Sequence, residues 1–339
     1  MINVALLSRW HVHADDYARN AQDNSNISIQ LVWDEEAERG RKWAEELGVT
    51  FEESLEAVLS NPAIDAVIVN TPTNLHKKVI IAAAKHKKHI FSEKVLAFSV
   101  EDCNEIYDAV EENGVHLMLS LPRLTESYYL YAQEALDSGK LGKLTTIRCR
   151  MAHNGAVVRE GEESGWLPDR FYNKEQAGGG ALIDLGAHPI YLTNRLAGQA
   201  HSVQATLQQT NGLGVDDNAV VLVDYKSGAL GIIETGFLSH GSPFQLELYG
   251  TAGTLLIEDG RIRITSSKFE ESGWQTPENP EALPMPMNQW ATAIINGTIP
   301  SITKDDAIRL TLINEAAALS HQEGKRINLK DVSSIVQNI

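Results

Sequence analysis

The sequence has little of what marks secreted, membrane-spanning or disulfide-stabilised proteins. Its 339 residues include two cysteines, Cys103 and Cys149, which lie far apart in the chain and suggest no disulfide framework. No uninterrupted run of about 18 apolar residues is present, which argues against a membrane span. The N-terminus lacks the basic and apolar segments of a secretory signal. We therefore expect a cytoplasmic protein with no membrane partner.

Positive charge is also scarce. Lys and Arg number 29 against 45 Asp and Glu, which gives a formal net charge of −16 at pH 7. Duplex nucleic acids are bound largely through Lys and Arg contacts to phosphate, so this balance disfavours a nucleic-acid partner. Lysines do gather at Lys85, Lys87, Lys88 and Lys94. Because they flank one short strand in an acidic chain, we interpret them as a solvated helix end.

The remaining composition is that of an ordinary globular protein with room for two domains. Hydrophobic residues make up 43% and charged residues 22% of the chain. Residues 1–121 alternate strand and helix patterns, which predicts a parallel, doubly wound α/β sheet. Residues 122–339 carry longer strand patterns, with a hairpin at Asp259-Gly260, flanked by helices. They predict an α+β domain with a large, mainly antiparallel sheet.

Glycine is absent from the turn where a nucleotide-binding domain normally has it. The first predicted strand, Ile2–Leu7, runs into the turn Ser8–His13 and then into a helix. The phosphate fingerprint G-x-G-x-x-G would place its glycines at Ser8, Trp10 and His13. The backbone N–H groups and the helix N-terminus remain, but the bulky side chains must point elsewhere. The turn is open to three interpretations: an unusual dinucleotide site, a site that has lost its cofactor, or something else.

A metal site in this turn is an alternative. His11 and His13 are two residues apart, and Asp15 and Asp16 follow closely. These four residues would form a strained local cluster, and no cysteine or second histidine pair supports it. We therefore predict no metal.

The second predicted strand ends at an acidic residue. Asp34 lies 21 residues beyond His13, close to the distance at which a carboxylate binds the ribose hydroxyls of a dinucleotide. Glu35 and Glu36 follow and would repel a 2′-phosphate, so NAD is favoured over NADP. The alternative is that Asp34 only caps the next helix.

Two further polar stretches follow buried strands. The segment Asn70–His76, NTPTNLH, leaves the strand that ends near Val69, and Glu93-Lys94 follows the next strand. In an open α/β sheet, ligands bind at the carboxyl ends of the strands. We expect both stretches at that edge, although an isolated Glu-Lys pair is commonly a surface ion pair.

The stretch GGGALIDLGAH is the most informative part of the second domain. Gly178–Gly180 open a segment with a helical pattern, and Asp184 and His188 are four residues apart, which predicts one shared helix face. A carboxylate and an imidazole on one face form a plausible acid/base pair. Pro189 should kink the helix at that point. A purely structural role for the pair is the alternative.

Taken in order, these stretches resemble the motifs of the glucose–fructose oxidoreductase/inositol dehydrogenase/MocA-like (Gfo/Idh/MocA) oxidoreductase family. Thr71-Pro72 with His76 is similar to its T-P-x-x-x-H motif, and Glu93-Lys94 to E-K-P. Gly178–His188 is similar to G-G-G-x-x-x-D-x-G-x-H. The resemblance covers nearly the whole chain.

The resemblance implies an NAD-binding Rossmann domain over residues 1–121. Over residues 122–339 it implies an α/β substrate-binding and oligomerisation domain with a large, predominantly antiparallel open sheet. It also implies an NAD-dependent oxidoreductase. Apart from the resemblance, an exposed apolar face of the large sheet would be an interaction surface, so we expect a homodimer or homotetramer. The substrate would be a sugar, a polyol or a related compound, oxidised or reduced at a secondary alcohol or ketone.

Roles for individual residues follow from the same resemblance. Lys94 would orient the substrate hydroxyl and stabilise developing charge, His188 would act as general base or acid, and Asp184 would hold the substrate or the proton-exchanging group. Arg123 would contact the substrate or form an interdomain ion pair. Trp166 would stack on a sugar face or pack as part of a lid. The implied cofactor contacts are Ser8, Trp10, His11, Val12, His13, Asp34, Thr71, Pro72, Asn74, His76, Glu93 and Lys94.

The chain departs from the family pattern at three places. The phosphate turn lacks its glycines, Val95 replaces the proline of E-K-P, and Tyr191 stands where many relatives have Asp. Two alternative functions therefore stay open. One is a ligand-binding or regulatory protein that kept the fold without catalysis. The other is a glycosidase that uses a retained NAD for transient oxidation.

Overall fold

The computed structural model describes residues 1–332 and contains two compact units. The first comprises Met1–Pro122 and Pro284–Ala307, and the second comprises Arg123–Leu283 and the chain from Ile308 onward. The first break thus falls one residue from the predicted boundary at 121/122. The later segment Pro284–Ala307 is counted from the sequence with the second domain, whereas its contacts lie with the first unit.

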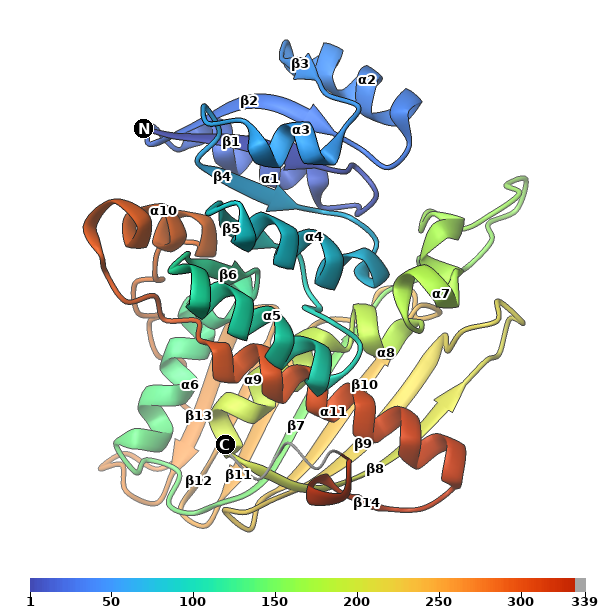
Figure 1. Ribbon diagram of the computed structural model, residues 1–339. Helices are drawn as coiled ribbons and strands as arrows, with labels where there is room; N and C mark the ends of the chain where they lie inside the picture. Colours follow the sequence, from blue (N-terminus) through green and yellow to red (C-terminus); the bar gives the residue numbers. More distant parts are fainter. Residues whose placement is uncertain (333–339) are drawn as a thin grey trace. The chain divides into compact units, whose positions relative to one another are not determined.

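The first unit is built on a six-stranded parallel sheet in the order β3-β2-β1-β4-β5-β6 (Figure 1). The strand order reverses between β1 and β4, which is the ligand-binding position of a doubly wound sheet. The predicted doubly wound sheet is confirmed. The strands are β1 (Ile2–Leu7), β2 (Ile27–Trp33), β3 (Thr50–Phe51), β4 (Ala66–Val69), β5 (His89–Ser92) and β6 (Leu117–Leu119).

Two helices of this unit, α2 and α5, end where the sequence supplies glycine. Gly48 and Gly114 adopt left-handed conformations, with φ of 69° and 65°, directly after the second and fifth helices. A helix from the later segment joins the unit, because Trp290 packs against Phe91 with ring centroids 5.7 Å apart. The helices are α1 (Ala14–Asp23), α2 (Ala37–Leu47), α3 (Leu55–Ser60), α4 (Thr73–Lys85), α5 (Val100–Asn113) and α10 (Pro286–Asn296).

The second unit contains an eight-stranded sheet in the order β13-β12-β11-β7-β10-β9-β8-β14 (Figure 1). Its strands pair antiparallel except for β7 and β10, which run parallel. The predicted open, mostly antiparallel sheet is confirmed. The strands are β7 (Leu144–Ala152), β8 (Ala200–Gln208), β9 (Asn218–Tyr225), β10 (Leu230–Gly236), β11 (Gln245–Gly250), β12 (Gly253–Glu258), β13 (Arg261–Ser266) and β14 (Ile327–Asn328).

One face of this sheet is covered by helices and the other exposes apolar side chains. Figure 1 shows α9 and α11 lying across the covered face, and α9 contacts β7 and β10. Along β9, exposed Val220 and Leu222 alternate with buried neighbours, as expected for a sheet covered on one side. The helices are α6 (Ser127–Asp137), α7 (Lys174–Ala177), α8 (Ala181–Asp184), α9 (Ala187–Ala197) and α11 (Lys304–Glu323), with short 3₁₀ turns at Pro122–Thr125, Asp169–Tyr172 and Leu329–Asp331.

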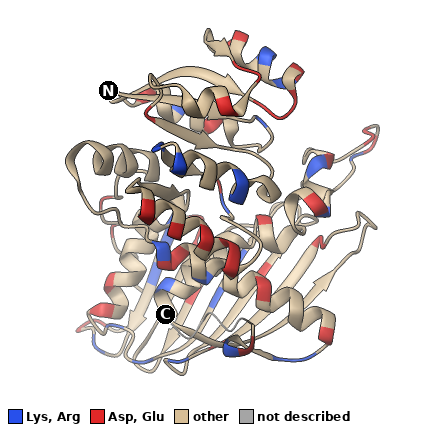
Figure 2. Ribbon diagram, viewed as in Figure 1, with Lys and Arg blue, Asp and Glu red and all other residues tan. Residues whose placement is uncertain are grey.

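The cysteines and the charge distribution agree with the composition. Cys103 and Cys149 are both buried thiols, and neither forms a disulfide. Acidic side chains are spread over both units, with a dense group on α5 (Figure 2). Within residues 1–332, no helix combines the length and the apolar character that a membrane crossing requires.

Candidate functional site

The turn after β1 adopts a conformation for which glycine is normally selected. Ser8 is fully buried and has a φ of 75°, in the left-handed region. A residue with a Cβ pays about 1–2 kcal/mol for this conformation, so the backbone follows a glycine-type path without the glycine. Trp10 and His11 are buried in the unit, whereas Val12 and His13 are exposed. The bulky side chains of Trp10 and His11 thus lie inside the unit, whereas those of Val12 and His13 face solvent, and the turn itself stays compact.

The side chains considered as a metal cluster have separate partners. His11 Nε2 lies 3.8 Å from Glu93 Oε1, while His13 Nδ1 lies 2.9 Å from Asp16 Oδ2. Asp15 accepts hydrogen bonds from the guanidinium of Arg9 at 2.9 and 3.0 Å. These contacts give each side chain a structural role within the turn and the first turn of α1.

The backbone N–H groups of the turn are bonded within the chain. The Trp10 N–H donates to Ser8 Oγ at 3.0 Å, and the His13 N–H donates to His11 Nδ1 at 3.2 Å. The His11 N–H donates to the Asn70 carbonyl at 3.2 Å. Ser8 and His11 thus provide acceptors where a phosphate oxygen would otherwise bind, so a pyrophosphate at this turn must replace them.

Asp34, at the end of β2, holds the turn in place. Its carboxylate accepts from the N–H groups of Arg9 and Glu36, both at 2.8 Å, and from the Arg39 guanidinium at 2.6 and 2.9 Å. Four donors match the roughly four acceptor positions of a carboxylate. In this structure Asp34 therefore stabilises the turn after β1 and the start of α2. A ribose hydroxyl that binds Asp34 must displace one of these donors.

Arg39 is part of the same cluster and was not identified from the sequence. Its guanidinium lies 2.6 Å from Glu35 and 3.3 Å from Glu36, in addition to its contact with Asp34. Burial raises the pKa of Glu35, with the charge of Asp34 acting in the same direction, against a hydrogen bond from Ser8. Three carboxylates surround one guanidinium, so the cluster stays acidic where the adenosine end of a dinucleotide would lie.

Unsatisfied polar atoms mark the end of β4, next to this turn. Among the described residues, the amide of Asn70 and the hydroxyl of Thr71 are buried without a hydrogen-bond partner. Buried polar groups of native proteins are nearly always hydrogen-bonded, so an unpaired pair at a strand end fits a ligand-binding position. Pro72 is buried beside them, whereas Asn74 is exposed on α4. Asn70 was quoted in its motif but not singled out as a contact.

His76 fixes this strand end to the segment after β5. Its ring is buried, with Nδ1 2.9 Å from the Val95 carbonyl and Nε2 3.1 Å from the Thr71 carbonyl. Burial lowers the pKa of His76, although these carbonyls oppose the shift. The contacts to backbone carbonyls give His76 a role in placing the two motif segments side by side.

Glu93 and Lys94, which follow β5, are buried rather than exposed. Lys94 Nζ lies 3.8 Å from Glu93 Oε1, and both side chains are almost fully covered. The Tyr17 hydroxyl of α1 donates to Glu93 and lies 2.7 Å from the Ser120 hydroxyl. This burial separates the pair from an ordinary surface ion pair. Tyr17 was missed in the sequence, although its position four residues after His13 on α1 is a usable signal.

The glycines of the second unit have a packing role. A Cβ on Gly180 would lie 1.9 Å from the Asp216 carbonyl oxygen, so only glycine fits there. Asp216 accepts from the N–H groups of Gly180 and Leu182 at 2.9 and 2.8 Å, which caps the start of α8. Burial raises the pKa of Asp216, and these two hydrogen bonds oppose it. Asp216 carries no signal of this role in the sequence.

The helix that carries Asp184 and His188 is interrupted between them. Residues 185 and 186 separate α8 from α9, with the Gly186 N–H bonded to the Ala181 carbonyl and the His188 N–H to the Leu185 carbonyl. Because no continuous helix joins Asp184 and His188, their four-residue spacing does not by itself place them on one shared helix face. The predicted kink at Pro189 is wrong, because Pro189 lies in the first turn of α9, where its missing N–H costs no hydrogen bond.

His188 has a specific partner in its own unit. Its Nδ1 lies 2.8 Å from the Tyr191 hydroxyl, which in turn accepts from the Arg123 backbone N–H at 3.3 Å. Both rings are buried. Burial raises the pKa of Tyr191 well above its ordinary value.

The two predicted substrate contacts differ in exposure. The Arg123 guanidinium donates to the Tyr128 hydroxyl at 3.0 Å and lies 4.7 Å from the centre of the Phe244 ring. Trp166 is 53% exposed, and its indole packs on His153 with centroids 4.7 Å apart. Trp166 thus presents an aromatic surface to solvent, whereas Arg123 is held by its own unit.

Comparison with known proteins assigns these features to a family. The profile of the oxidoreductase family with an NAD-binding Rossmann fold matches residues 11–121, and that of the GFO/IDH/MocA C-terminal domain matches residues 129–256. The chain belongs to the Gfo/Idh/MocA oxidoreductase family. The family named from the sequence motifs is confirmed.

Individual relatives of this Gfo/Idh/MocA chain act on sugar-like compounds. Scyllo-inositol 2-dehydrogenase (NAD(+)) of Bacillus subtilis (strain 168) is 29% identical over 306 residues, which cover 86% of this chain and 85% of that protein. 2,7-anhydro-N-acetylneuraminate hydratase of Escherichia coli (strain K12) is 29% identical over 274 residues, covering 78% and 70%. A structure of levoglucosan dehydrogenase with NADH and levoglucosan has a TM-score of 0.83 at 22% identity, covering 97% and 99%.

These comparisons establish an NAD-binding oxidoreductase of the Gfo/Idh/MocA family. Two departures of this member from its family pattern have a visible structural form. Ser8 adopts the left-handed conformation described above, and Val95 is buried after a cis peptide bond from Lys94.

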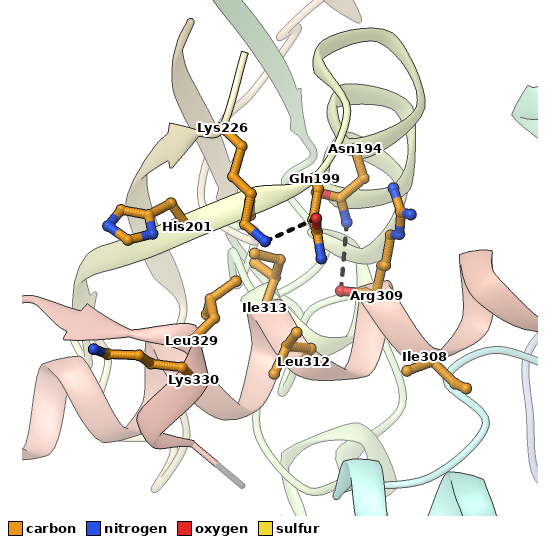
Figure 3. Close-up of a pocket in the computed structure, with 11 residues that line it drawn as sticks. Asn194, Gln199, His201, Lys226, Ile308, Arg309, Leu312, Ile313, Leu329 and Lys330 are labelled. Carbon is orange, nitrogen blue, oxygen red and sulfur yellow. Dashed lines mark hydrogen bonds between the residues drawn. The ribbon is translucent and has the colours of Figure 1, made fainter. Parts of the chain in front are cut away.

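A separate cavity lies at the far end of α9. It encloses about 220 Å³, and Figure 3 shows Lys226 donating to Gln199 at 2.9 Å and Asn194 donating to the Arg309 carbonyl at 3.4 Å on its wall. Among the described residues that line it are none of the site residues predicted from the sequence. The cavity is therefore distinct from the candidate site.

Proposed function

We propose that this protein is an NAD-dependent oxidoreductase that transfers hydride between nicotinamide and a secondary alcohol or ketone of a sugar, polyol or related compound. The observation that carries the proposal is the buried pair Asn70 and Thr71 at the end of β4, whose side-chain polar atoms lack partners within residues 1–332. They stand at the strand edge where a doubly wound sheet binds a dinucleotide. The inositol and levoglucosan dehydrogenases among the relatives support the substrate class.

The residues of the first unit fit NAD. When bound, the cofactor supplies the hydride acceptor or donor, while the protein binds and orients it. The N–H groups of Trp10 and His13, which now donate to side chains of the turn, would hold the pyrophosphate. Asn70 and Thr71 provide further hydrogen bonds. The remaining contacts proposed from the sequence, including Val12, Pro72 and Asn74, stay predictions.

The acidic cluster at the end of β2 favours NAD over NADP. Asp34, Glu35 and Glu36 surround the single guanidinium of Arg39. A 2′-phosphate would add close to two negative charges beside them, whereas ribose hydroxyls need only acceptors. We therefore propose NAD as the physiological cofactor.

Three residues are proposed as catalytic groups: Lys94, Asp184 and His188. Lys94 donates a hydrogen bond to a substrate oxygen and stabilises charge that develops there, and its burial strengthens this interaction. His188 hydrogen-bonds the substrate oxygen, and Asp184 holds the substrate or the proton-exchanging group. Trp166 offers a surface on which a sugar ring can stack. The position of the Arg123 side chain on Tyr128 makes it the weaker of the two proposed substrate contacts.

A panel of sugars and polyols with NAD, followed at the nicotinamide absorbance, tests the proposal. We expect turnover with at least one compound and a decrease of kcat/KM of about 100-fold or more in Lys94→Met and His188→Gln. Lys226→Met is the matched control, because Lys226 lines the separate cavity. Turnover that survives both site substitutions would show that the chemistry lies elsewhere.

The hydratase among the relatives favours one second candidate, a reaction with no net oxidation. In that case, product would form from an anhydro sugar without accumulation of NADH, and the same substitutions would abolish it. A protein that binds sugars and shows neither reaction would instead be a ligand-binding member of the family. Product analysis by mass spectrometry separates these outcomes.

A further inference from the structure

A hydrogen-bonded chain of three groups fixes the ring of His188 from within the second unit. The Arg123 backbone N–H donates to the Tyr191 hydroxyl oxygen at 3.3 Å, and this hydroxyl lies 2.8 Å from His188 Nδ1. Tyr191 is 1% exposed and His188 is 9% exposed. Water therefore has little access to the contact between the two rings.

The number of protons in this chain decides which atom donates. The phenol of Tyr191 carries one proton, and burial raises its pKa so far that the hydroxyl stays protonated in neutral solution. The Arg123 N–H is a donor and accepts nothing. Within residues 1–332, His188 Nδ1 is the acceptor within reach of that proton. If Nδ1 carried a proton instead, the buried hydroxyl would lose its acceptor, which proteins strongly disfavour.

We propose that Tyr191 is a positioning residue that holds neutral His188 in the Nε2–H tautomer. The imidazole then presents an N–H donor, and not a basic lone pair, to a substrate oxygen. This inference rests on the proposed function, whose general base or acid it redefines. A carboxylate at position 191 would have the opposite effect, because it accepts a hydrogen bond from Nδ1–H and leaves Nε2 unprotonated as the acceptor.

The tautomer determines what His188 can do in the reaction. In alcohol oxidation the hydroxyl proton must move to an acceptor, and an Nε2–H group cannot take it without losing its own proton. His188 therefore orients and polarises the substrate oxygen, and the proton passes to another group. The carboxylate of Asp184 is the candidate already assigned to the reaction, because Lys94 is a donor to the same oxygen.

Nitrogen NMR of the cofactor-free protein tests this inference directly. With ¹⁵N-labelled histidine, long-range ¹H–¹⁵N spectra at pH 8 distinguish a protonated ring nitrogen from an unprotonated one. The chain has 11 histidines, and the signals lost in His188→Gln identify His188. We expect His188 to show an unprotonated Nδ1 and a protonated Nε2.

Substitutions at position 191 supply the comparison. Tyr191→Phe should give a mixture of tautomers, and Tyr191→Asp should give mainly the Nδ1–H form. Tyr225→Phe is the matched control, because Tyr225 is a buried tyrosine of the same unit that bonds Asn194 at 3.3 Å. It should leave the His188 signals unchanged, and unaltered signals of the other histidines report that each variant is folded.

Two results would overturn the inference: an Nδ1–H tautomer in the unmodified protein, or a Tyr191→Phe spectrum identical to it. If Tyr191→Phe does not fold, the unmodified protein and Tyr191→Asp still decide the question. The measurement uses neither NAD nor substrate. A protein that oxidises no sugar yet shows the Nε2–H tautomer would disprove the proposed function and leave the tautomer assignment intact.

Discussion

Ser8 and Asp34 are the residues that hold the turn after β1 in its compact form. Ser8 takes a left-handed backbone and accepts from the Trp10 N–H, while Asp34 binds the Arg9 N–H from the end of β2. In both contacts, a side chain of the protein accepts the hydrogen bond of a backbone N–H group in the turn. The side chains thus stabilise the cofactor-free turn and compete with the phosphate that we propose to bind there.

Removing the Ser8 hydroxyl should strengthen NADH binding. Both Ser8→Ala and Ser8→Gly free the Trp10 N–H, and a hydrogen bond of about 1 kcal/mol corresponds to about fivefold in Kd. Only Ser8→Gly also relieves the left-handed backbone, so a further gain in that variant measures the conformational part. Titration of NADH fluorescence gives both values. Unchanged Kd values in both variants would show that this N–H group does not bind the cofactor.

The acidic cluster should decide between the two dinucleotides. In the double variant Glu35→Gln with Glu36→Gln, Arg39 keeps one carboxylate partner, and two negative charges are gone. We expect NADPH to bind about tenfold or more tightly, whereas NADH changes little, because each removed like charge contributes about 1 kcal/mol. Isothermal titration calorimetry with both cofactors measures this. Equal changes for NADH and NADPH would mean that the cluster does not face the 2′ position.

At the scale of elements, His76 and Gly180 connect segments that sequence motifs present as separate. His76 joins the end of β4 to the segment after Lys94 through two backbone carbonyls. Gly180 allows the backbone of Asp216 to approach the start of α8. Each is a motif residue whose observed contacts are structural. These contacts hold the neighbouring polar groups in position.

His76 should make stability depend on pH below neutrality. Burial lowers the pKa of His76, so the folded state keeps the ring neutral while the unfolded chain takes up a proton below about pH 6.5. The free energy of unfolding should be level above that pH. Below it, stability should decrease by at most about 1.4 kcal/mol per pH unit until the folded ring also protonates.

Urea unfolding at pH 7.5 and 5.5 checks this with two variants. His76→Gln should lose this part of the decrease. His89→Gln is the control, because burial and the charge of His116 lower the pKa of His89 in the same direction and that variant should keep the His76 part. An unaltered pH slope in His76→Gln would contradict the role of burial.

The glycine triplet offers a sharp pair of variants. Gly180→Ala would place a Cβ 1.9 Å from the Asp216 carbonyl, so we expect a loss of about 3 kcal/mol or more. In the adjacent Gly179→Ala, the nearest atom is a methyl group of Ile183 at 3.2 Å, and the loss should stay within about 1 kcal/mol. Thermal unfolding of the two proteins measures the difference. Similar losses would refute the packing explanation.

Long strands and helices could be predicted from the sequence, whereas contacts between distant segments could not. The run Ile2–Leu7 carries its structural signal locally, and the predicted strand is confirmed. Gly48 and Gly114 are local signals of the same kind, because each directly follows a helix. Strands β3 and β14 contain two residues each, too few for an apolar pattern. Asp216 caps residues that precede it in the chain by 34 and 36 positions, and no local pattern reveals this role.

The candidate site could likewise be predicted from the sequence only in part. Its motif residues could be identified, because their spacing is specific to the family. Arg39 and Ser120 could not, since each is an ordinary side chain until the fold brings Arg39 to a carboxylate and Ser120 to the Tyr17 hydroxyl. The interruption of the helix before His188 is not apparent from the sequence either, because Pro189 suggests a break at a later position.

At the scale of the whole molecule, the main feature is the open face of the eight-stranded sheet, which no helix within residues 1–332 covers. Val220, Leu222 and Leu230 are 40%, 46% and 54% exposed there. Four charged side chains lie among them, two of each sign: Arg148 is bound to Glu234 and Glu247, and Arg150 lies 3.9 Å from Glu234. A surface that is apolar and internally neutral can meet a copy of itself, so we propose a homodimer or homotetramer through this face.

Light scattering coupled to size-exclusion chromatography tests this assembly. Leu222→Lys should shift the protein to a smaller species, because one buried lysine in each copy opposes contact. Ile299→Lys introduces the same charge at a side chain that is 94% exposed outside the sheet and should leave the mass unchanged. A monomeric unmodified protein would exclude the proposed interface.

The central claim is that the glycine-free turn and the end of β4 bind NAD. The most direct measurement is a fluorescence titration of the unmodified protein, Asn70→Ala and Thr71→Val with NADH. We predict saturable binding by the unmodified protein, weakened about tenfold in Asn70→Ala, since each lost hydrogen bond to the cofactor contributes about 1 kcal/mol. No saturable binding up to about millimolar NADH, or identical binding by all three proteins, would contradict the claim.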